Sequence, residues 1–195
     1  VLLALYATAC TAFPIHTFKP SATDKYLEDY QLDDEYDKPH VAQAPETPSD
    51  NASLLIYLSG TGSSPGDATG FLKTAVASGL YSLGLSYQQC HLTSQGVGRW
   101  CNTFKKDCSC QGHIHAAVLQ GGAQTSIPAR SLSNESQTIA VQAPSSVMNR
   151  VLSALEWLHH HEPEAGWDSF YTVTFATSPD VDVKWARVTI AGHGQ

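Results

Sequence analysis

The chain has 195 residues, of which 42% are hydrophobic and 15% charged, and its formal net charge is -7. This length and composition suit one globular domain with a sizeable core and exclude two large domains. Nine of the eighteen acidic residues lie within residues 24–50, so the negative charge is local, and the chain has neither a basic face for nucleic acid nor a run of about 18 apolar residues to span a bilayer.

The first ten residues are almost entirely apolar, and Ala7-Thr8-Ala9 has the small-x-small form of a signal-peptide cleavage site. We interpret residues 1–14 as part of a signal peptide and expect a secreted protein; a buried strand or helix is the alternative. Cys10 would also allow a lipoprotein anchor, which Ala7 disfavours because such sites usually carry leucine there. The missing methionine and the apolar run directly before the last residues lead us to expect part of a longer protein.

Residues 15–52 are rich in Pro, Asp, Glu, Ser and Thr, and residues 26–37 are acidic with spaced tyrosines. Such a composition buries too little apolar area to offset the entropy of ordering. We therefore expect a flexible propeptide or linker, with docking or sulfation of the tyrosines as an alternative role. Asn51 here and Asn134 further on lie in N-x-Ser acceptor sequences, which suit a secreted chain.

The ordered domain is expected to begin at residues 54–58, a short continuous apolar run typical of a parallel strand covered on both faces. A glycine-rich turn containing Gly60, Thr61 and Gly62 follows, where backbone amides can approach an anion. Apolar residues then recur at helical spacing up to Gly79, and residues 81–87 form a second strand. Strand, helix and strand make one βαβ unit.

Residues 88–143 are expected to be an irregular insertion containing four cysteines: Cys90, Cys101, Cys108 and Cys110. In an oxidising compartment these predict two disulfides, and the sequence does not choose among the three pairings. A zinc site is the alternative. It is disfavoured because the cysteine spacing lacks CxxC pairs and because His113 and His115 have the spacing of exposed residues on a strand.

Residues 145–161 predict a helix bracketed by Pro144 and Pro163. One face carries the apolar residues Val147, Val151, Leu152, Leu155 and Leu158. The run of histidines at 159–161 lies at the end of the helix, where imidazoles interact well with the helix dipole. Consecutive helical residues point about 100° apart, so the three do not converge on a metal. We expect the tryptophans to be core or loop anchors.

Residues 185–191 predict a third strand, which leads into Gly192-His193-Gly194-Gln195. Alternation of strand and helix indicates a parallel α/β sheet, and we expect residues 54–58 and Ile190 in that one sheet. The last residues are similar to the start of a nucleophile elbow, G-x-S-x-G, whose glycines relieve crowding in a sharp turn from strand to helix. Gly194 stands where the serine would be.

The sequence resembles a family of secreted or lipoprotein-like α/β-hydrolases over residues 53–195. The resemblance is carried by residues 55–65, 84–87, 149–151, 164–167 and 191–193, together with the cysteine-containing loop. In that family the last stretch continues as Gly-His-Ser-Gln-Gly. The resemblance implies the N-terminal part of an α/β-hydrolase fold, and it implies no particular substrate.

Carried over to this chain, the family pattern makes the backbone amides of Thr61 and Gln195 the oxyanion-hole donors. Gly194 occupies the nucleophile position and has no oxygen with which to form an acyl-enzyme. The acid and the histidine follow the nucleophile in this fold, so none of the residues of this sequence supplies them. The chain is then an inactive descendant of an ester or acyl hydrolase; a secreted binding pseudoenzyme and a non-functional fragment are the alternatives. An active form would take a small ester or acyl substrate, and we expect no metal or other cofactor. The sequence does not determine the oligomeric state.

Overall fold

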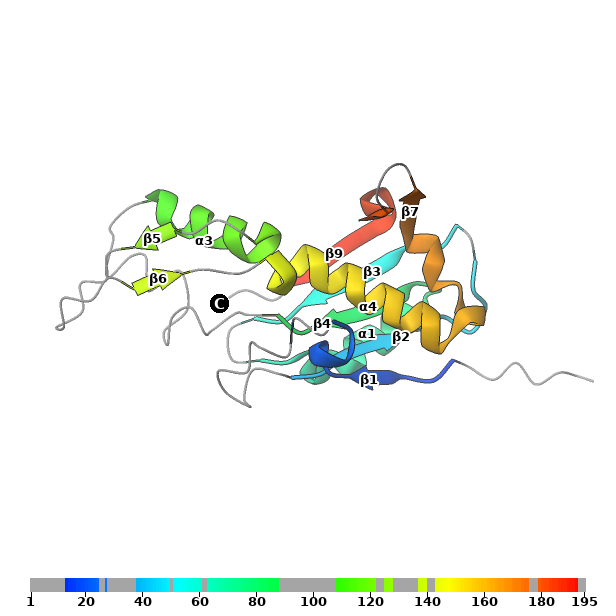
Figure 1. The fold of residues 1–195 in the computed structure, drawn as a ribbon. Coiled ribbons are helices and arrows are strands. Elements are labelled where there is room, and N and C mark those ends of the chain that lie inside the picture. The colour runs from blue at the N-terminus through cyan, green and yellow to red at the C-terminus, as the bar shows by residue number, and fades with distance from the viewer. Residues whose placement is uncertain are drawn as a thin grey trace, which may run out of the picture.

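The computed structural model describes residues 13–24, 27, 38–49, 51–60, 63–87, 108–121, 125–127, 137–139, 143–175 and 179–192. Figure 1 shows its strands and helices. The strands are β1 (His16–Phe18), β2 (His40–Gln43), β3 (Leu54–Leu58), β4 (Tyr81–Leu85), β5 (Thr125–Ile127), β6 (Gln137–Ile139), β7 (Tyr171–Phe175), β8 (Pro179–Val183) and β9 (Val188–Gly192). The α-helices are α1 (Thr69–Ala77), α3 (Cys108–Gln120) and α4 (Val147–His161). Short 3-10 turns are η1 (Pro20–Ala22), η3 (Pro65–Ala68), η5 (Ala143–Ser145), η6 (Pro163–Ala165), η7 (Trp167–Phe170) and η8 (Trp185–Arg187).

The central sheet has five strands in the order β1-β2-β4-β3-β9. The three strands predicted from the sequence, β3, β4 and β9, run parallel to one another. Strand β2 pairs antiparallel with β4, and β1 pairs antiparallel with β2. The sheet is therefore mixed and not purely parallel as predicted. With helices on its faces this sheet places the chain in the α/β class.

The prediction of a flexible linker over residues 15–52 is wrong for β1 and β2. His40 and Ala42 are fully buried in the sheet, and Gln43 donates a side-chain hydrogen bond of 3.1 Å to the carbonyl of Phe13. Partners distant in sequence supply the order that the local composition lacks, because β2 pairs with β4 about forty residues away. The acidic stretch 28–37 and residues 1–12 of the predicted signal peptide lie outside the described residues.

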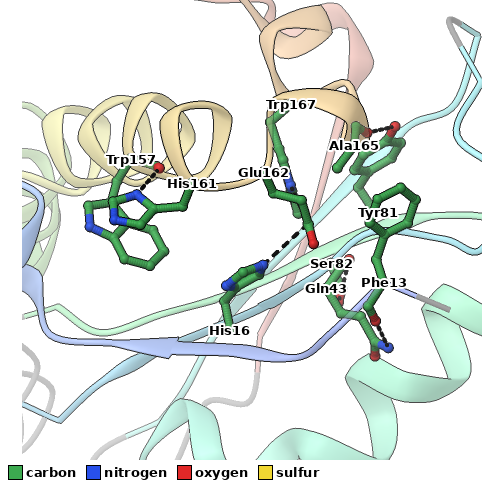
Figure 2. Close-up of polar contacts among 10 residues, drawn as sticks. All are labelled: Phe13, His16, Gln43, Tyr81, Ser82, Trp157, His161, Glu162, Ala165 and Trp167. Atoms are coloured by element: carbon green, nitrogen blue, oxygen red, sulfur yellow. Dashed lines mark hydrogen bonds and ion pairs between the residues drawn. The ribbon is translucent and has the colours of Figure 1, made fainter. Parts of the chain in front are cut away.

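Strand β1 is held against the end of α4 by a cluster of aromatic and charged side chains (Figure 2). Phe18 stacks on Trp157 with ring centroids 4.1 Å apart, and Trp157 in turn stacks on His161. The His16 Nε2 lies 3.2 Å from a carboxylate oxygen of the buried Glu162, without hydrogen-bond geometry. These contacts help to order β1, which among the described strands pairs with β2 alone.

The βαβ unit is confirmed, since β3, α1 and β4 follow one another and the two strands pair in parallel. Alternation of side chains sorts β4 onto two faces. Gly84 faces α1, because a Cβ built on it would lie 2.9 Å from Pro65 and 3.0 Å from Leu72. Tyr81, Leu83 and Leu85 lie on the opposite face, in the main core beneath α4. Figure 1 shows the two helices on opposite sides of the sheet.

Helix α4 confirms the helix predicted over residues 145–161. It begins after Ser146, whose hydroxyl accepts a hydrogen bond from the Asn149 amide, a preferred N-cap arrangement. Its buried face includes Val147, Val151, Leu155 and Leu158. The apolar spacing therefore located both the helix and the face that packs on the sheet.

The core is closed at the end of α4 by Tyr81 and the turn that follows the helix (Figure 2). The Tyr81 hydroxyl donates to the Ala165 carbonyl at 2.5 Å, and its ring meets those of Trp167 and Phe170 edge-on. Trp167 is fully buried, as predicted for a core anchor. Gly166 has a φ of +77°, a conformation that other residues rarely adopt.

The cysteine-containing insertion is more regular than predicted. Residues 108–120 form α3, and β5 and β6 form an antiparallel pair within the region expected to be irregular. His113 and His115 are exposed on this helix and not on a strand. The helix contains Cys108 and Cys110, whereas Cys90, Cys101 and Trp100 lie outside the described residues, so the disulfides remain a prediction.

The region between α4 and β9 contains a hairpin that the sequence did not suggest. Strands β7 and β8 pair antiparallel from Tyr171 opposite Val183 to Phe175 opposite Pro179. The third predicted strand begins later than expected, at Val188, because Trp185–Arg187 form the turn η8. Arg187 donates a hydrogen bond to the carbonyl of Ser169 and lies over the ring of Phe170, which joins β9 to the core.

Candidate functional site

The carboxyl ends of β3 and β9 lie side by side. The two strands pair in parallel, and the register places Leu58 opposite Gly192 at the end of both strands. Leu58, which precedes the glycine-rich turn, and Gly192, which begins the elbow-like sequence, therefore lie at the same edge of the sheet in neighbouring positions. The prediction that residues 54–58 and Ile190 share a sheet is confirmed.

This edge is also the topological switch point of the sheet. From β3 the chain passes through α1 on one face to β4, and it later returns through α4 on the other face to β9 on the opposite side of β3 (Figure 1). In open α/β sheets, ligands bind outside the carboxyl ends of the strands where the crossovers diverge. The geometry thus identifies the β3–β9 edge as the candidate site.

Hydrogen bonds hold the described residues at the two ends of the glycine-rich turn. The Gly60 carbonyl accepts hydrogen bonds from the Ser63 amide at 3.0 Å and the Ser63 hydroxyl at 2.7 Å. Ser59 is fully buried, and its carbonyl accepts a bond of 3.0 Å from the Tyr87 hydroxyl. Thr61 and Gly62, the two central residues of the turn, lie outside the described residues.

Donors at the start of the following helical segment are already occupied by the chain itself. Ser64 and Asp67 form a capping box in which the Asp67 carboxylate accepts from the Ser64 amide at 2.7 Å and from its hydroxyl at 2.9 Å. These two hydrogen bonds lower the pKa of Asp67, and the bond from the Ser64 amide has the larger effect. The amide and the hydroxyl of Ser64 are therefore occupied by Asp67 and not directed at a ligand anion.

Gly192 is the first glycine of the elbow-like sequence, and the structure shows why a side chain is unfavourable there. A Cβ built on Gly192 would approach the Leu58 carbonyl oxygen to 3.3 Å. The crowding arises from β3, the strand that leads into the glycine-rich turn. His193, Gly194 and Gln195 lie outside the described residues, so the elbow conformation remains a prediction.

A buried polar network lies next to this edge, at the carboxyl end of β4. The Ser86 amide donates to His40 Nδ1 at 2.9 Å, and the Ser86 carbonyl accepts from Arg150 Nη1 at 3.2 Å. Arg150 is 6% exposed and also donates through Nε to the Ser145 carbonyl at 3.0 Å. Burial, and then the positive charge of Arg150, lowers the pKa of His40 to about 3. His40 is thus neutral in the folded protein and accepts through Nδ1.

Sequence reasoning selected Gly60 and missed His40, Ser86, Tyr87 and Arg150 as parts of this edge. Tyr87 and Arg150 stood in stretches that carried the family resemblance, which was a usable signal. For His40 there was none, because a histidine in a polar, acidic segment is expected to be exposed. Of the glycosylation candidates, Asn51 is exposed and Asn134 lies outside the described residues.

In the part of the chain that the structure describes, no three His, Cys, Asp or Glu side chains are placed to hold a metal ion. None of the described helices has the length and apolar character needed to cross a membrane. No protein-family model, no curated protein and no solved structure matches the chain. The structure alone therefore defines the class, an α/β protein with a mixed sheet and a candidate site at its switch point.

Proposed function

We propose that the chain is an α/β-hydrolase-type protein that binds a small ester or other acyl compound at the β3–β9 edge without serine-type turnover. One observation carries this proposal: β3 and β9 are parallel neighbours with Leu58 opposite Gly192. In α/β-hydrolases one oxyanion donor comes from the loop after such a strand, and the other from the residue after the nucleophile. The strands that lead into the corresponding two segments of this chain are neighbours at this edge.

The register supports the assignment of donors. Thr61 stands three residues beyond Leu58, and Gln195 stands three residues beyond the paired Gly192. Three residues span at most about 10 Å, which limits how far each amide can lie from the Leu58–Gly192 pair. Amides at such a site bind the carbonyl oxygen of an acyl group, and each is worth about 3 kcal/mol where an oxyanion develops.

Gly194 accounts for the absence of turnover in this proposal. A glycine has no hydroxyl, so the attack on the carbonyl that forms an acyl-enzyme has no nucleophile at this position. A glycine also adopts the strained backbone of an elbow at little steric cost, which lets the site keep its shape. Binding thus remains possible where covalent catalysis is not.

A secreted location completes the proposal. The apolar start of the chain, the cysteines at 90, 101, 108 and 110, and the acceptor asparagines 51 and 134 support export into an oxidising compartment. Mass spectrometry of the chain after expression through a secretory pathway would test it. We expect two disulfides and cleavage within residues 7–14; a chain with an intact leader, in which the cysteines at 90, 101, 108 and 110 are all free thiols, would contradict it.

The binding experiment uses the purified chain and p-nitrophenyl butyrate, a short-chain aryl ester. We expect amide shifts in a ¹H–¹⁵N spectrum at Ser59, Ser63 and Gly192, with nitrophenolate released no faster than in buffer. Shifts elsewhere, or none at millimolar ester, would overturn the proposed site. Ester turnover by the unaltered chain would overturn its description as non-catalytic.

A paired substitution then tests the hydrolase ancestry. Because the acid and the histidine follow the nucleophile in this fold, both variants are made in the longer protein that we expect from the sequence. Gly194→Ser restores a hydroxyl there, and Gly194→Ala is the matched control, because it places the same backbone demand on the turn without one. Turnover by the serine variant alone would support an otherwise intact site. Equal inactivity of the two variants, both folded, would count against it.

A further inference from the structure

We propose that Tyr87 is a positioning residue that sets the place of the glycine-rich turn at the β3–β9 edge, and so the affinity of the site for its acyl ligand. This inference rests on the proposed function. Tyr87 follows β4 and not β3 or β9, so it would act on the ligand only through the turn. Its half-buried ring packs against the main core.

The contact that carries the inference is the hydrogen bond from the Tyr87 hydroxyl to the Ser59 carbonyl, 3.0 Å long. Ser59 is fully buried and is the first residue after β3. A buried carbonyl requires a donor, and here the donor comes from a neighbouring strand segment. The bond therefore fixes the point at which the chain leaves the sheet and begins the turn.

The other end of the turn, at Pro65, is fixed on β4. Pro65 packs directly over Gly84, where a Cβ would lie 2.9 Å from the Pro65 Cβ. Two contacts thus flank the turn: Pro65 packs on Gly84 of β4, and the Ser59 carbonyl is bonded to Tyr87, three residues beyond Gly84. Between these two points the Gly60 carbonyl accepts from the Ser63 amide at 3.0 Å, which closes the turn on itself.

Tyr87 is itself held by the buried network behind the edge. Both backbone polar groups of the preceding residue, Ser86, are bonded, the amide to His40 Nδ1 at 2.9 Å and the carbonyl to Arg150 Nη1 at 3.2 Å. His40 comes from β2 and Arg150 from α4, so two further elements fix the end of β4. A continuous set of hydrogen bonds then runs from β2 and α4 through residues 86 and 87 to Ser59.

The test compares Tyr87→Phe with Tyr57→Phe in the full chain. Tyr57 lies half-buried on β3 with its ring 5.7 Å from that of Phe71. It is a suitable control because, among the described residues, its hydroxyl has no recorded hydrogen-bond partner. Both variants lose one hydroxyl and keep the ring. Three quantities are measured: amide exchange at Ser63, amide exchange at Leu83 within β4, and the dissociation constant for p-nitrophenyl butyrate.

In Tyr87→Phe we expect exchange at Ser63 to accelerate about three- to tenfold, the effect of losing one net hydrogen bond, with exchange at Leu83 unchanged. The dissociation constant should rise by a similar factor. Tyr57→Phe should leave all three quantities within about twofold of the unaltered chain.

Unchanged exchange at Ser63 in Tyr87→Phe would overturn the inference, as would equal acceleration at Ser63 and Leu83, which would mark a general loss of stability. Faster exchange at Ser63 without weaker ester binding would also overturn it. If the unaltered chain binds no ester at all, the proposed function fails. Selective acceleration at Ser63 would still support the positioning of the turn by Tyr87.

Discussion

The two sides of β3 in the sheet differ sharply in how well they are covered. On one side β4 and β2 are enclosed by helices, and Leu83, Leu85 and Ala42 are fully buried. On the other side β9 pairs, among the described residues, with β3 alone, and Ile190 is 57% exposed. The candidate site lies on the boundary between them. On one side of the site β4 is buried in a packed core, and on the other side β9 is largely exposed.

The difference indicates where stability and binding reside. Core contacts beneath α4 supply most of the buried apolar area, whereas β9 contributes mainly the backbone that faces β3. An open strand edge with an exposed apolar side chain also invites association with other chains. The most informative experiments therefore compare equivalent changes on the two sides of the sheet.

The largest effect is expected from Leu83→Ala on the covered side. Removing a fully buried leucine leaves a cavity and should lower the free energy of unfolding by about 2–5 kcal/mol. Urea denaturation followed by circular dichroism measures it. A cost below about 1 kcal/mol would mean that the core beneath α4 is not closely packed.

A smaller loss is expected from Gly84→Ala, which pushes a methyl group into Pro65 and Leu72. Overpacking of this kind costs about 1–3 kcal/mol. Gly70→Ala in α1 is the matched control, because nothing lies within 4 Å of a Cβ there, and alanine should stabilise the helix by up to about 1 kcal/mol. If both variants lost stability equally, the close approach of Pro65 to β4 would be contradicted.

Acid should weaken the covered side through His40. Its pKa is about 3 in the folded protein and 6.5 when exposed, so the unfolded chain binds the extra proton between these values. The contribution to stability is complete above pH 6.5 and decreases as the pH falls toward 3, by up to about 1.4 kcal/mol per pH unit. Thermal unfolding between pH 7 and pH 4 measures it.

The control for this pH dependence is His40→Asn, whose amide oxygen retains an acceptor for the Ser86 amide but does not titrate in this range. This variant should be less stable at pH 7, with a flatter dependence on pH below 6. A pH profile parallel to that of the unaltered chain would assign the acid sensitivity to other groups.

The smallest effect is expected from Ile190→Ala on the open side. Because Ile190 is 57% exposed, truncation should change the free energy of unfolding by less than about 1 kcal/mol. The same denaturation assay applies. A loss as large as that of Leu83→Ala would show that β9 is covered in solution, and the comparison between the two sides would fail.

The amino-acid sequence by itself determined the elements whose signals are local. The continuous apolar run at 54–58, the helical spacing from Val147 to Leu158 and the serine before it lie within one element each, and each predicted the observed element to within a few residues. The chain also leaves the sheet after Leu58, directly before the predicted glycine-rich turn, whose central residues Thr61 and Gly62 lie outside the described residues.

Only the tertiary structure decided which strands become neighbours. Strands β1 and β2 arise in an acidic segment whose composition predicts disorder, and they are ordered by β4 and by Trp157 and Glu162. The pairing of Leu58 with Gly192 and the bond from Tyr87 to Ser59 join residues far apart in the chain. Local patterns predict single elements because propensity, capping and periodicity act over a few residues, whereas contacts across a sheet depend on the whole chain closing around one core.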